Sequence, residues 1–168
     1  MNTDQTRIGE TTSQATDCYD QTPVEPLARG ETTSRVIGAA FEVHNVLGYG
    51  FLEKVYQRAM QVELIKRGST AEMENPIKVR YKNAVVGEYY ADLLVDRCVI
   101  VEIKVARSYN PEDEAQILNE LKATGMKVGM LVNFGRERVQ YKRLVLVSSV
   151  SIGGQNIISP VNFRVGER

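Results

Sequence analysis

The sequence has few of the features that mark secreted, membrane-spanning or disulfide-rich proteins. It holds two cysteines, Cys18 in a polar stretch and Cys98 in an apolar run, which is not the pattern of a disulfide framework. No apolar run approaches the ~18 residues that a membrane helix needs, and the N-terminus lacks the apolar segment of a signal peptide. We therefore expect a cytoplasmic protein that does not enter a membrane.

An excess of charge of one sign is also absent. Lys and Arg together number 21, and Asp and Glu together also number 21, so the formal net charge is +0. If nucleic acid is the partner, a local basic patch or a metal ion must hold its phosphates, because the field of the whole molecule does not attract them. The length of 168 residues and the hydrophobic share of 43% suit one globular domain with its own core.

Composition divides the chain into three parts. Residues 1–30 are polar and aperiodic. We therefore expect a loose tail, or an arm that becomes ordered when it binds a second copy of the chain, as in a homodimer, or another protein partner. The structured domain is predicted over 31–147, with helix N-cap candidates at Thr32–Ser34. Residues 148–168 give weak signals and are assigned to a C-terminal extension.

Two helices are predicted at the start of the domain. Apolar residues recur at helical spacing from Val36 to Leu47, and the glycines at 48 and 50 end that helix. A second helix ends at Gly68. Its inner face is expected to comprise Leu52, Val55, Ala59, Met60 and Val62.

The pattern then changes to that of a sheet. Three consecutive strands are predicted at 77–81, 85–95 and 99–105. A helix capped by Asn110-Pro111 and closed by Gly125 follows, and then two further strands, at 127–135 and 138–147. A strand–helix–strand order implies one parallel pairing beside an antiparallel meander. We therefore predict a mixed α/β fold, a mixed sheet flanked by helices.

The hairpin "ADLLVDRCVIVEIKV", residues 91–105, interrupts two apolar runs with Asp92, Glu102 and Lys104. A two-residue loop would place Asp92 and Glu102 on opposite faces, whereas a three-residue loop, 96–98, pairs them directly. The three-residue loop is favoured because it gathers one apolar face. That face comprises Ala91, Leu93, Val95, Val101, Ile103 and Val105.

Two carboxylates on one face repel each other unless a cation lies between them. Asp92 and Glu102 offer the oxygen-rich setting that Mg²⁺ prefers, with Mn²⁺ as a substitute, and Lys104 could stabilise developing charge at a phosphate. The alternative is a cluster of charges on a solvated sheet face. Such triplets are common, so the triplet alone does not decide between the two.

Further motifs extend the pattern along the chain. "GFLEKVY" at 50–56, and Asp92 followed after nine residues by Glu102-Ile103-Lys104, resemble the GxxExxY proteins of the PD-(D/E)xK nuclease superfamily. The segments "EAQILNELKATG" and "KVGMLVNFG" are similar to that family too. The resemblance covers residues 32–146 and implies a restriction-endonuclease-like αβββαβ core.

The resemblance also implies roles for individual residues. Asp92 and Glu102 would be the main metal ligands, joined by Glu53 and the Ile103 carbonyl, and Lys104 would be the catalytic lysine. Gln116 matches a glutamine that supports the site in the family. Two positions depart from the family pattern: Glu120 stands where a tyrosine is common, and Asp113 where a histidine is frequent.

Several other residues are further candidates for the site or for contacts with nucleic acid. His44, the only histidine, lines the site or is structural. Tyr56 is expected to pack, with its hydroxyl bonded near the site. Two basic groups either contact phosphates or are solvated strand edges: Lys78, Arg80 and Lys82, and Arg136, Arg138, Lys142 and Arg143.

The predicted function is a Mg²⁺-dependent nuclease that hydrolyses phosphodiester bonds, in DNA rather than RNA. The complete set of Glu53, Asp92, Glu102 and Lys104 favours this enzyme. The alternative is a catalytically silent module with the nuclease fold, a nucleic-acid-binding or scaffold subunit of a larger complex. The neutral net charge and the polar N-terminal arm favour the module.

Overall fold

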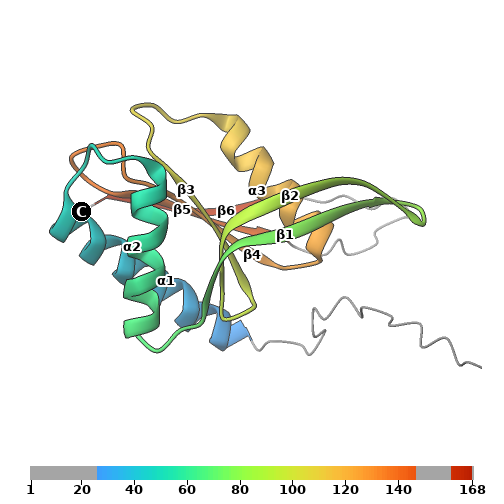
Figure 1. Cartoon of the computed structure of the whole chain (residues 1–168), viewed down its shortest axis with the longest axis horizontal. Coiled ribbons are helices and arrows are strands. Elements are labelled where there is room, and N and C mark those ends of the chain that lie inside the picture. Colours follow the sequence, from blue (N-terminus) through green and yellow to red (C-terminus); the bar gives the residue numbers. More distant parts are fainter. Residues whose placement is uncertain (1–25, 147–159, 168) are drawn as a thin grey trace, which may run out of the picture.

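The computed structural model describes residues 26–146 and 160–167 (Figure 1). The predictions for residues 1–25, including Cys18, and for most of the C-terminal extension lie outside these ranges. Cys98 is a buried free thiol. Within the described ranges, no helix is both long and apolar enough to cross a membrane.

The centre of the fold is one sheet whose strands follow each other in chain order. Neighbouring strands are antiparallel except β3 and β4, which are parallel and joined by helix α3, Pro111–Thr124. The predicted mixed α/β fold is confirmed, but the last strand was not predicted. The strands are β1 Ala71–Tyr81, β2 Ala84–Val95, β3 Val99–Lys104, β4 Val128–Asn133, β5 Gln140–Leu146 and β6 Pro160–Glu167.

Helices cover both faces of the sheet (Figure 1). Helices α1, Pro26–Leu47, and α2, Glu53–Lys66, pack on one face, and α3 packs on the other. Strand β3 contributes Val101 to the first core and Ile100 to the second. A charged side chain on β3 is therefore surrounded by protein on either face, where an unpaired charge is costly.

Helix α1 begins at Pro26, six residues before the predicted N-cap at Thr32. The hydroxyls that suggested a cap are bonded within the fold instead. Thr32 Oγ1 donates to Asp96 Oδ2 at 2.9 Å, and Ser34 Oγ donates to the Gly30 carbonyl at 3.0 Å. The predicted domain boundary at residue 31 therefore falls inside a helix.

Helix α2 has a different buried face from the predicted one. Leu52 and Val62 are 79% and 53% exposed. Tyr56 fixes the rotation, because its ring stacks on Phe134 with centroids 4.5 Å apart and its hydroxyl donates to the Gly48 carbonyl at 2.8 Å. The buried residues are Tyr56, Gln57, Met60 and Leu64, and Glu53 lies one turn before Gln57 on the same side.

The hairpin of β2 and β3 has the predicted three-residue loop. Val95 pairs with Val99 and Leu93 with Val101, so Asp92 and Glu102 fall on one face in this register. The apolar set was wrong for Ala91, which packs in the core under α3 together with Leu94. Because α3 covers that side, the polar residues of the hairpin do not lie on a solvated face.

The predicted cap of α3 and the predicted helix ends at glycine are confirmed. Asn110 Oδ1 accepts from Glu112 N at 3.0 Å to cap α3, and Gly125 ends that helix with φ 75°. Gly48 and Gly50, after α1, have φ values of 68° and 111°. These conformations favour glycine, which carries no Cβ.

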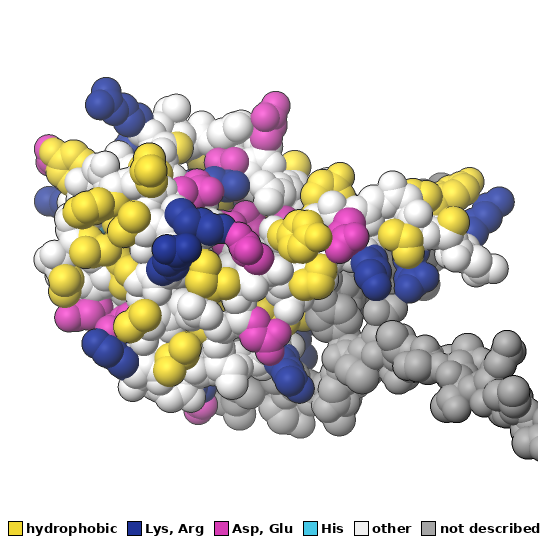
Figure 2. All heavy atoms as spheres, in the orientation of Figure 1, with side chains coloured by type: hydrophobic (Ala, Val, Ile, Leu, Met, Phe, Trp, Pro, Cys, Tyr) yellow, Lys and Arg dark blue, Asp and Glu magenta, His cyan; other side chains and the backbone are white. Residues whose placement is uncertain are grey.

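Strands β1 and β2 extend beyond the rest of the sheet as a two-stranded arm (Figure 1). Its outer part carries exposed hydrophobic and basic side chains (Figure 2). Register shifts between Val79 and Arg80, which increases the local twist. The exposed large hydrophobic residues of the arm are Tyr81, Val85, Val86, Tyr89 and Tyr90.

Candidate active site

Glu102, on β3, is the most deeply buried acid of the hairpin, with 1% of its surface exposed. Its Oε1 accepts from Asp92 N at 3.3 Å, and its Oε2 accepts from Gln116 Nε2 at 3.0 Å. Lys104 Nζ lies 3.6 Å from the same Oε2. Burial, followed by the carboxylates of Asp92 and Glu120, raises the pKa of Glu102 to about 9.

Asp92 lies on β2 where pairing between β2 and β3 ends. Its Oδ2 accepts from Ile103 N at 2.7 Å, and its Oδ1 accepts from Gln57 Nε2 at 2.7 Å. Burial is the main reason that the pKa of Asp92 is raised. The site therefore disfavours the ionised form of a second carboxyl group beside Glu102.

The Ile103 carbonyl faces the same side as Asp92. Successive residues of a strand direct their backbone groups to opposite sides. Ile103 N donates toward Asp92, whereas the next carbonyl, of Lys104, accepts from Phe134 N at 2.8 Å on the β4 side. The position past the end of the β2 ladder thus offers a main-chain oxygen next to Asp92.

Glu53 is the first residue of α2 and is half-buried. Burial and then the Asp92 carboxylate raise the pKa of Glu53, while Lys104 and the backbone N–H of Val105 act in the opposite direction. The rotation of α2 therefore brings a third acid from a separate element into electrostatic contact with Asp92 and Lys104.

Lys104 is half-buried at the end of β3. Burial alone would lower its pKa, but the carboxylates around it raise the pKa above its ordinary value. These carboxylates belong to Glu102, Glu53, Asp113 and Asp92. The lysine is therefore held as an ammonium ion, and its Nζ donates to Gln116 Oε1 at 3.3 Å.

Helix α3 contributes Gln116 and Glu120, one turn apart. Gln116 Nε2 donates to Glu102 and also to Glu120 Oε1, at 3.0 Å in both cases. Glu120 is 2% exposed, its Oε2 has no hydrogen-bond partner among the described residues, and burial raises its pKa. Glu120, one of the two residues that depart from the family pattern, is thus a further acid of the site.

A model of the PD-(D/E)XK nuclease superfamily matches residues 30–144. The chain belongs to the PD-(D/E)XK nuclease superfamily. The matched range contains every residue placed in the site above. A search of the curated proteins and a search of the solved structures returned no match.

PD-(D/E)XK nucleases generally use divalent metals, and the donors of this site suit one. Carboxylate and carbonyl oxygens are hard ligands of the kind that Mg²⁺ and Mn²⁺ prefer. Four acids with raised pKa values lie around one lysine, and a cation bound among them would favour the ionised forms that burial disfavours. These acids are Glu53, Asp92, Glu102 and Glu120.

The acids are not assembled as a ready metal cage. Among the described residues, no group of three His, Cys, Asp or Glu side chains is placed to hold an ion. Amide groups donate to the carboxylates instead: Gln57 to Asp92, and Gln116 to Glu102.

Sequence reasoning missed Gln57 and treated Glu120 and Asp113 only as departures. Helical spacing gives the signal that could have found the first two, because Gln57 follows Glu53 by four residues and Glu120 follows Gln116 by four. Asp113 lies on the same helix and acts on the charge of Lys104.

His44 is in the last turn of α1, and its side chain contacts the turn between β4 and β5. Its Nε2 is 2.9 Å from the Glu137 carbonyl, and its ring centroid is 6.3 Å from that of Phe134. Its contacts are with this turn and not with the carboxylates, in keeping with the structural reading. Tyr56 packs as predicted, and its hydroxyl holds the turn that leads into α2.

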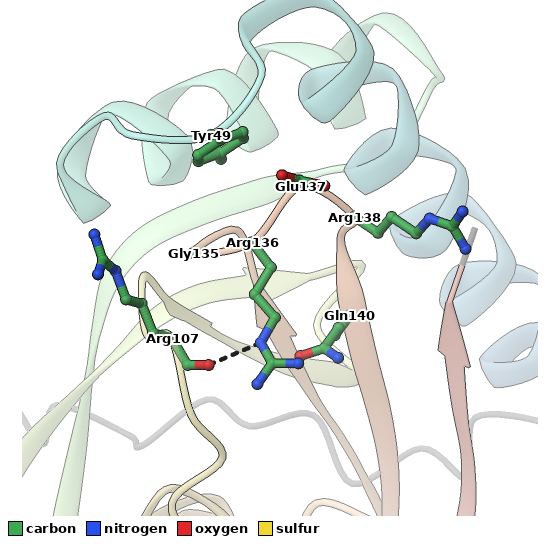
Figure 3. A pocket seen from close by; sticks show the side chains of 7 residues that line it. All are labelled: Tyr49, Arg107, Gly135, Arg136, Glu137, Arg138 and Gln140. Carbon is green, nitrogen blue, oxygen red and sulfur yellow. Dashed lines mark hydrogen bonds between the residues drawn. The ribbon is translucent and has the colours of Figure 1, made fainter.

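The predicted basic residues have different surroundings in the structure. Lys142 forms an ion pair with Glu114 and lies over the Tyr109 ring, 5.4 Å from its centroid. Arg136 and Arg138 line a pocket (Figure 3). The other group, Lys78, Arg80 and Lys82, is exposed on the β1–β2 arm.

The segment after Lys104 is clamped against the end of β4. Asn133 Oδ1 accepts from Ala106 N at 3.0 Å, and Asn133 Nδ2 donates to the Ala106 carbonyl at 2.8 Å. Gly135 lies so close that a Cβ there would be 2.4 Å from Ala106 N. The main chain that carries Lys104 into the site therefore has little room to move.

Proposed function

We propose that this protein is a Mg²⁺-dependent nuclease of the GxxExxY group that hydrolyses phosphodiester bonds, in DNA rather than RNA. The observation that carries the proposal is the buried group of acids around one protonated lysine. Such a group disfavours its own ionisation in the absence of a cation. Membership of the PD-(D/E)XK superfamily supports the same reaction class.

The proposed roles follow from the contacts of each residue. Asp92, Glu102 and the Ile103 carbonyl would hold the cation, with Glu53 reaching it from α2. The bound ion would polarise the scissile phosphate and activate water. Lys104 would stabilise the additional negative charge of the transition state.

Gln116 is proposed as a positioning residue. It donates to Glu102 and accepts from Lys104, so it sets the distance between a metal-binding carboxylate and the catalytic ammonium. Glu120 would hold Gln116 in turn, because its Oε1 accepts the same amide group.

Replacement of Lys104 tests the proposal most directly. We expect Lys104→Ala to keep the fold and Mn²⁺ binding but to lose activity by a factor on the order of 10² or more, as when one transition-state donor is removed. Cleavage of labelled single- and double-stranded DNA and RNA is measured with Mg²⁺ or Mn²⁺, and metal binding by calorimetry. Lys66→Ala, an exposed lysine on α2, is the matched control. Equal cleavage by Lys104→Ala and wild type would refute the role of Lys104.

A second candidate is the catalytically silent module. The amide donors on Asp92 and Glu102 favour it, because they satisfy carboxylate oxygens without a metal. This candidate predicts that the wild type cleaves none of the four substrates and binds no Mn²⁺, while it retains affinity for nucleic acid. The same assays therefore separate the two functions.

A further inference from the structure

Three connecting segments line a pocket of about 510 Å³. They are the turn after α1, the segment after β3, and the turn between β4 and β5 (Figure 3). The lining residues are Tyr49, Arg107, Gly135, Arg136, Glu137, Arg138 and Gln140.

The pocket is basic in a chain whose formal net charge is zero. Three arginines and one glutamate line it, a difference of +2 (three minus one). Arg136 Nε donates to the Arg107 carbonyl at 2.8 Å. The guanidinium groups of Arg107 and Arg138 have no hydrogen-bond or ion-pair partner among the described residues. By contrast, Lys142 is already paired with Glu114.

The pocket is held at a fixed place relative to the acids. The Lys104 carbonyl accepts from Phe134 N, Ala106 is clamped by Asn133, and the Arg107 carbonyl accepts from Arg136. The short segment from Lys104 to Arg107 is therefore anchored along its length. Three residues span at most about 11 Å. One strand of a nucleic acid duplex rises about 3.4 Å per nucleotide, so the main chain at Lys104 and at Arg107 is separated by no more than about three nucleotides of such a strand.

We propose that this pocket binds the phosphate backbone of the nucleic acid, beside the phosphate that is cleaved. Arg107 and Arg138 extend to opposite sides of the pocket (Figure 3), so each would donate to a separate backbone phosphate, for which the planar guanidinium group is well suited. Tyr49, 57% exposed on the pocket wall, would provide a ring on which a base can stack. This inference rests on the proposed nuclease function and adds to it a site for substrate.

Binding of fluorescein-labelled single- and double-stranded DNA tests the inference. Affinity is measured by anisotropy over a series of salt concentrations, with every variant in the Lys104→Ala background to prevent cleavage. The test variants are Arg107→Ala and Arg138→Ala. The matched control is Arg97→Ala, which removes an exposed arginine from the turn at the opposite end of β3.

We expect each test variant to bind several-fold more weakly, with equal reductions for different DNA sequences. The slope of log affinity against log salt should decrease by about 1 for each phosphate that the variant no longer neutralises, and the control should keep the original slope. Unchanged slopes in both test variants, or an equal reduction in the control, would overturn the inference. Displacement of DNA by inorganic phosphate at similar concentration would also overturn it, because a free anion and not a strand would be the ligand.

The outcomes separate this inference from the proposed nuclease function. If the wild type cleaves DNA and the test variants bind normally, the pocket is not a substrate site and the nuclease proposal stands. If the wild type cleaves nothing but the test variants bind DNA more weakly than the control, the pocket stands and the nuclease proposal fails. If the background protein binds no nucleic acid, the inference fails.

Discussion

Asp92 and Asp96 lie four residues apart on one hairpin, but their surroundings differ in kind. Asp96 accepts from Thr32 Oγ1 at 2.9 Å, Ser69 Oγ at 3.2 Å and Thr70 N at 2.9 Å. An arginine, Arg35, lies 3.6 Å from its Oδ2. Asp92 receives two donors and faces other carboxylates.

A structural acid thus differs from an acid that is available for chemistry in the donors and charges around its carboxylate. The carboxylate of Asp96 is compensated by donors from α1 and from the segment between α2 and β1, so it fixes the turn that these elements share. The acids around Lys104 outnumber this single cation, and burial, followed by repulsion from neighbouring carboxylates, raises the pKa of Glu102. Burial alone does not distinguish the two cases, whereas the balance of donors and charges does.

The largest effect is expected when the uncompensated acids are neutralised. Asp92→Asn and Glu102→Gln should lose metal binding and reduce cleavage by a factor on the order of 10³, because a metal contributes several kcal/mol to catalysis. Calorimetry with Mn²⁺ and the cleavage rate check this. Asp96→Asn is the control. Its Mn²⁺ binding and its cleavage rate, each measured per folded molecule, should equal those of the wild type. Strong Mn²⁺ binding by Glu102→Gln would show that the ion is held elsewhere.

A smaller effect is expected on the stability of the fold. Here replacement of Asp96 should have a larger effect than replacement of Asp92. Asp96→Ala leaves several donors unpaired, so it should lower the free energy of unfolding by about 2 kcal/mol. Asp92→Ala, in metal-free protein, should cost less or even stabilise, since it relieves repulsion between carboxylates. Urea denaturation with a chelator present measures both. If Asp92→Ala is the more destabilising of the two, the distinction between these acids is wrong.

A third effect is a pH dependence of the stability of the metal-free protein. Below pH 4.5, Glu102 is protonated in the folded and the unfolded chain. Above that value, the unfolded chain releases the proton while the folded chain retains it up to pH of about 9, so the free energy of unfolding falls as pH rises across this window. The midpoint of thermal unfolding should therefore decrease steadily from pH 5 to pH 9.

Glu102→Gln should flatten that decrease, whereas Asp96→Asn should leave it as in the wild type. The raised pKa values of Asp92, Glu53 and Glu120 act in the same direction, so part of the slope should remain in Glu102→Gln. A midpoint that rises with pH in metal-free wild type would contradict the placement of these acids.

The hairpin and its register could be predicted from the sequence because local signals decide them. Apolar alternation selects the loop length, and a slip by one residue would turn every side chain to the wrong face. The Asn110 cap and the Gly125 stop of α3 are equally local. The parallel pairing of β3 and β4 followed from the helix between them.

The face of α2 could not be predicted, because the helix has apolar residues on two sides. Tyr56 stacks on Phe134, 78 residues later in the chain (134 minus 56), and this distant contact selects which side is buried. The same rotation brings Gln57 to Asp92. The contribution of Glu120 likewise depends on how α3 packs, and propensity does not encode that packing.

The close approach of Gly135 to Ala106 has a consequence for tolerance to mutation. A methyl group at position 135 would overlap backbone atoms, not the end of a flexible side chain, so the segment that follows Lys104 would have to shift. Neither residue carries charge or reactive chemistry. A survey of inactivating changes that considers only charged residues would therefore overlook one of the least replaceable positions in the chain.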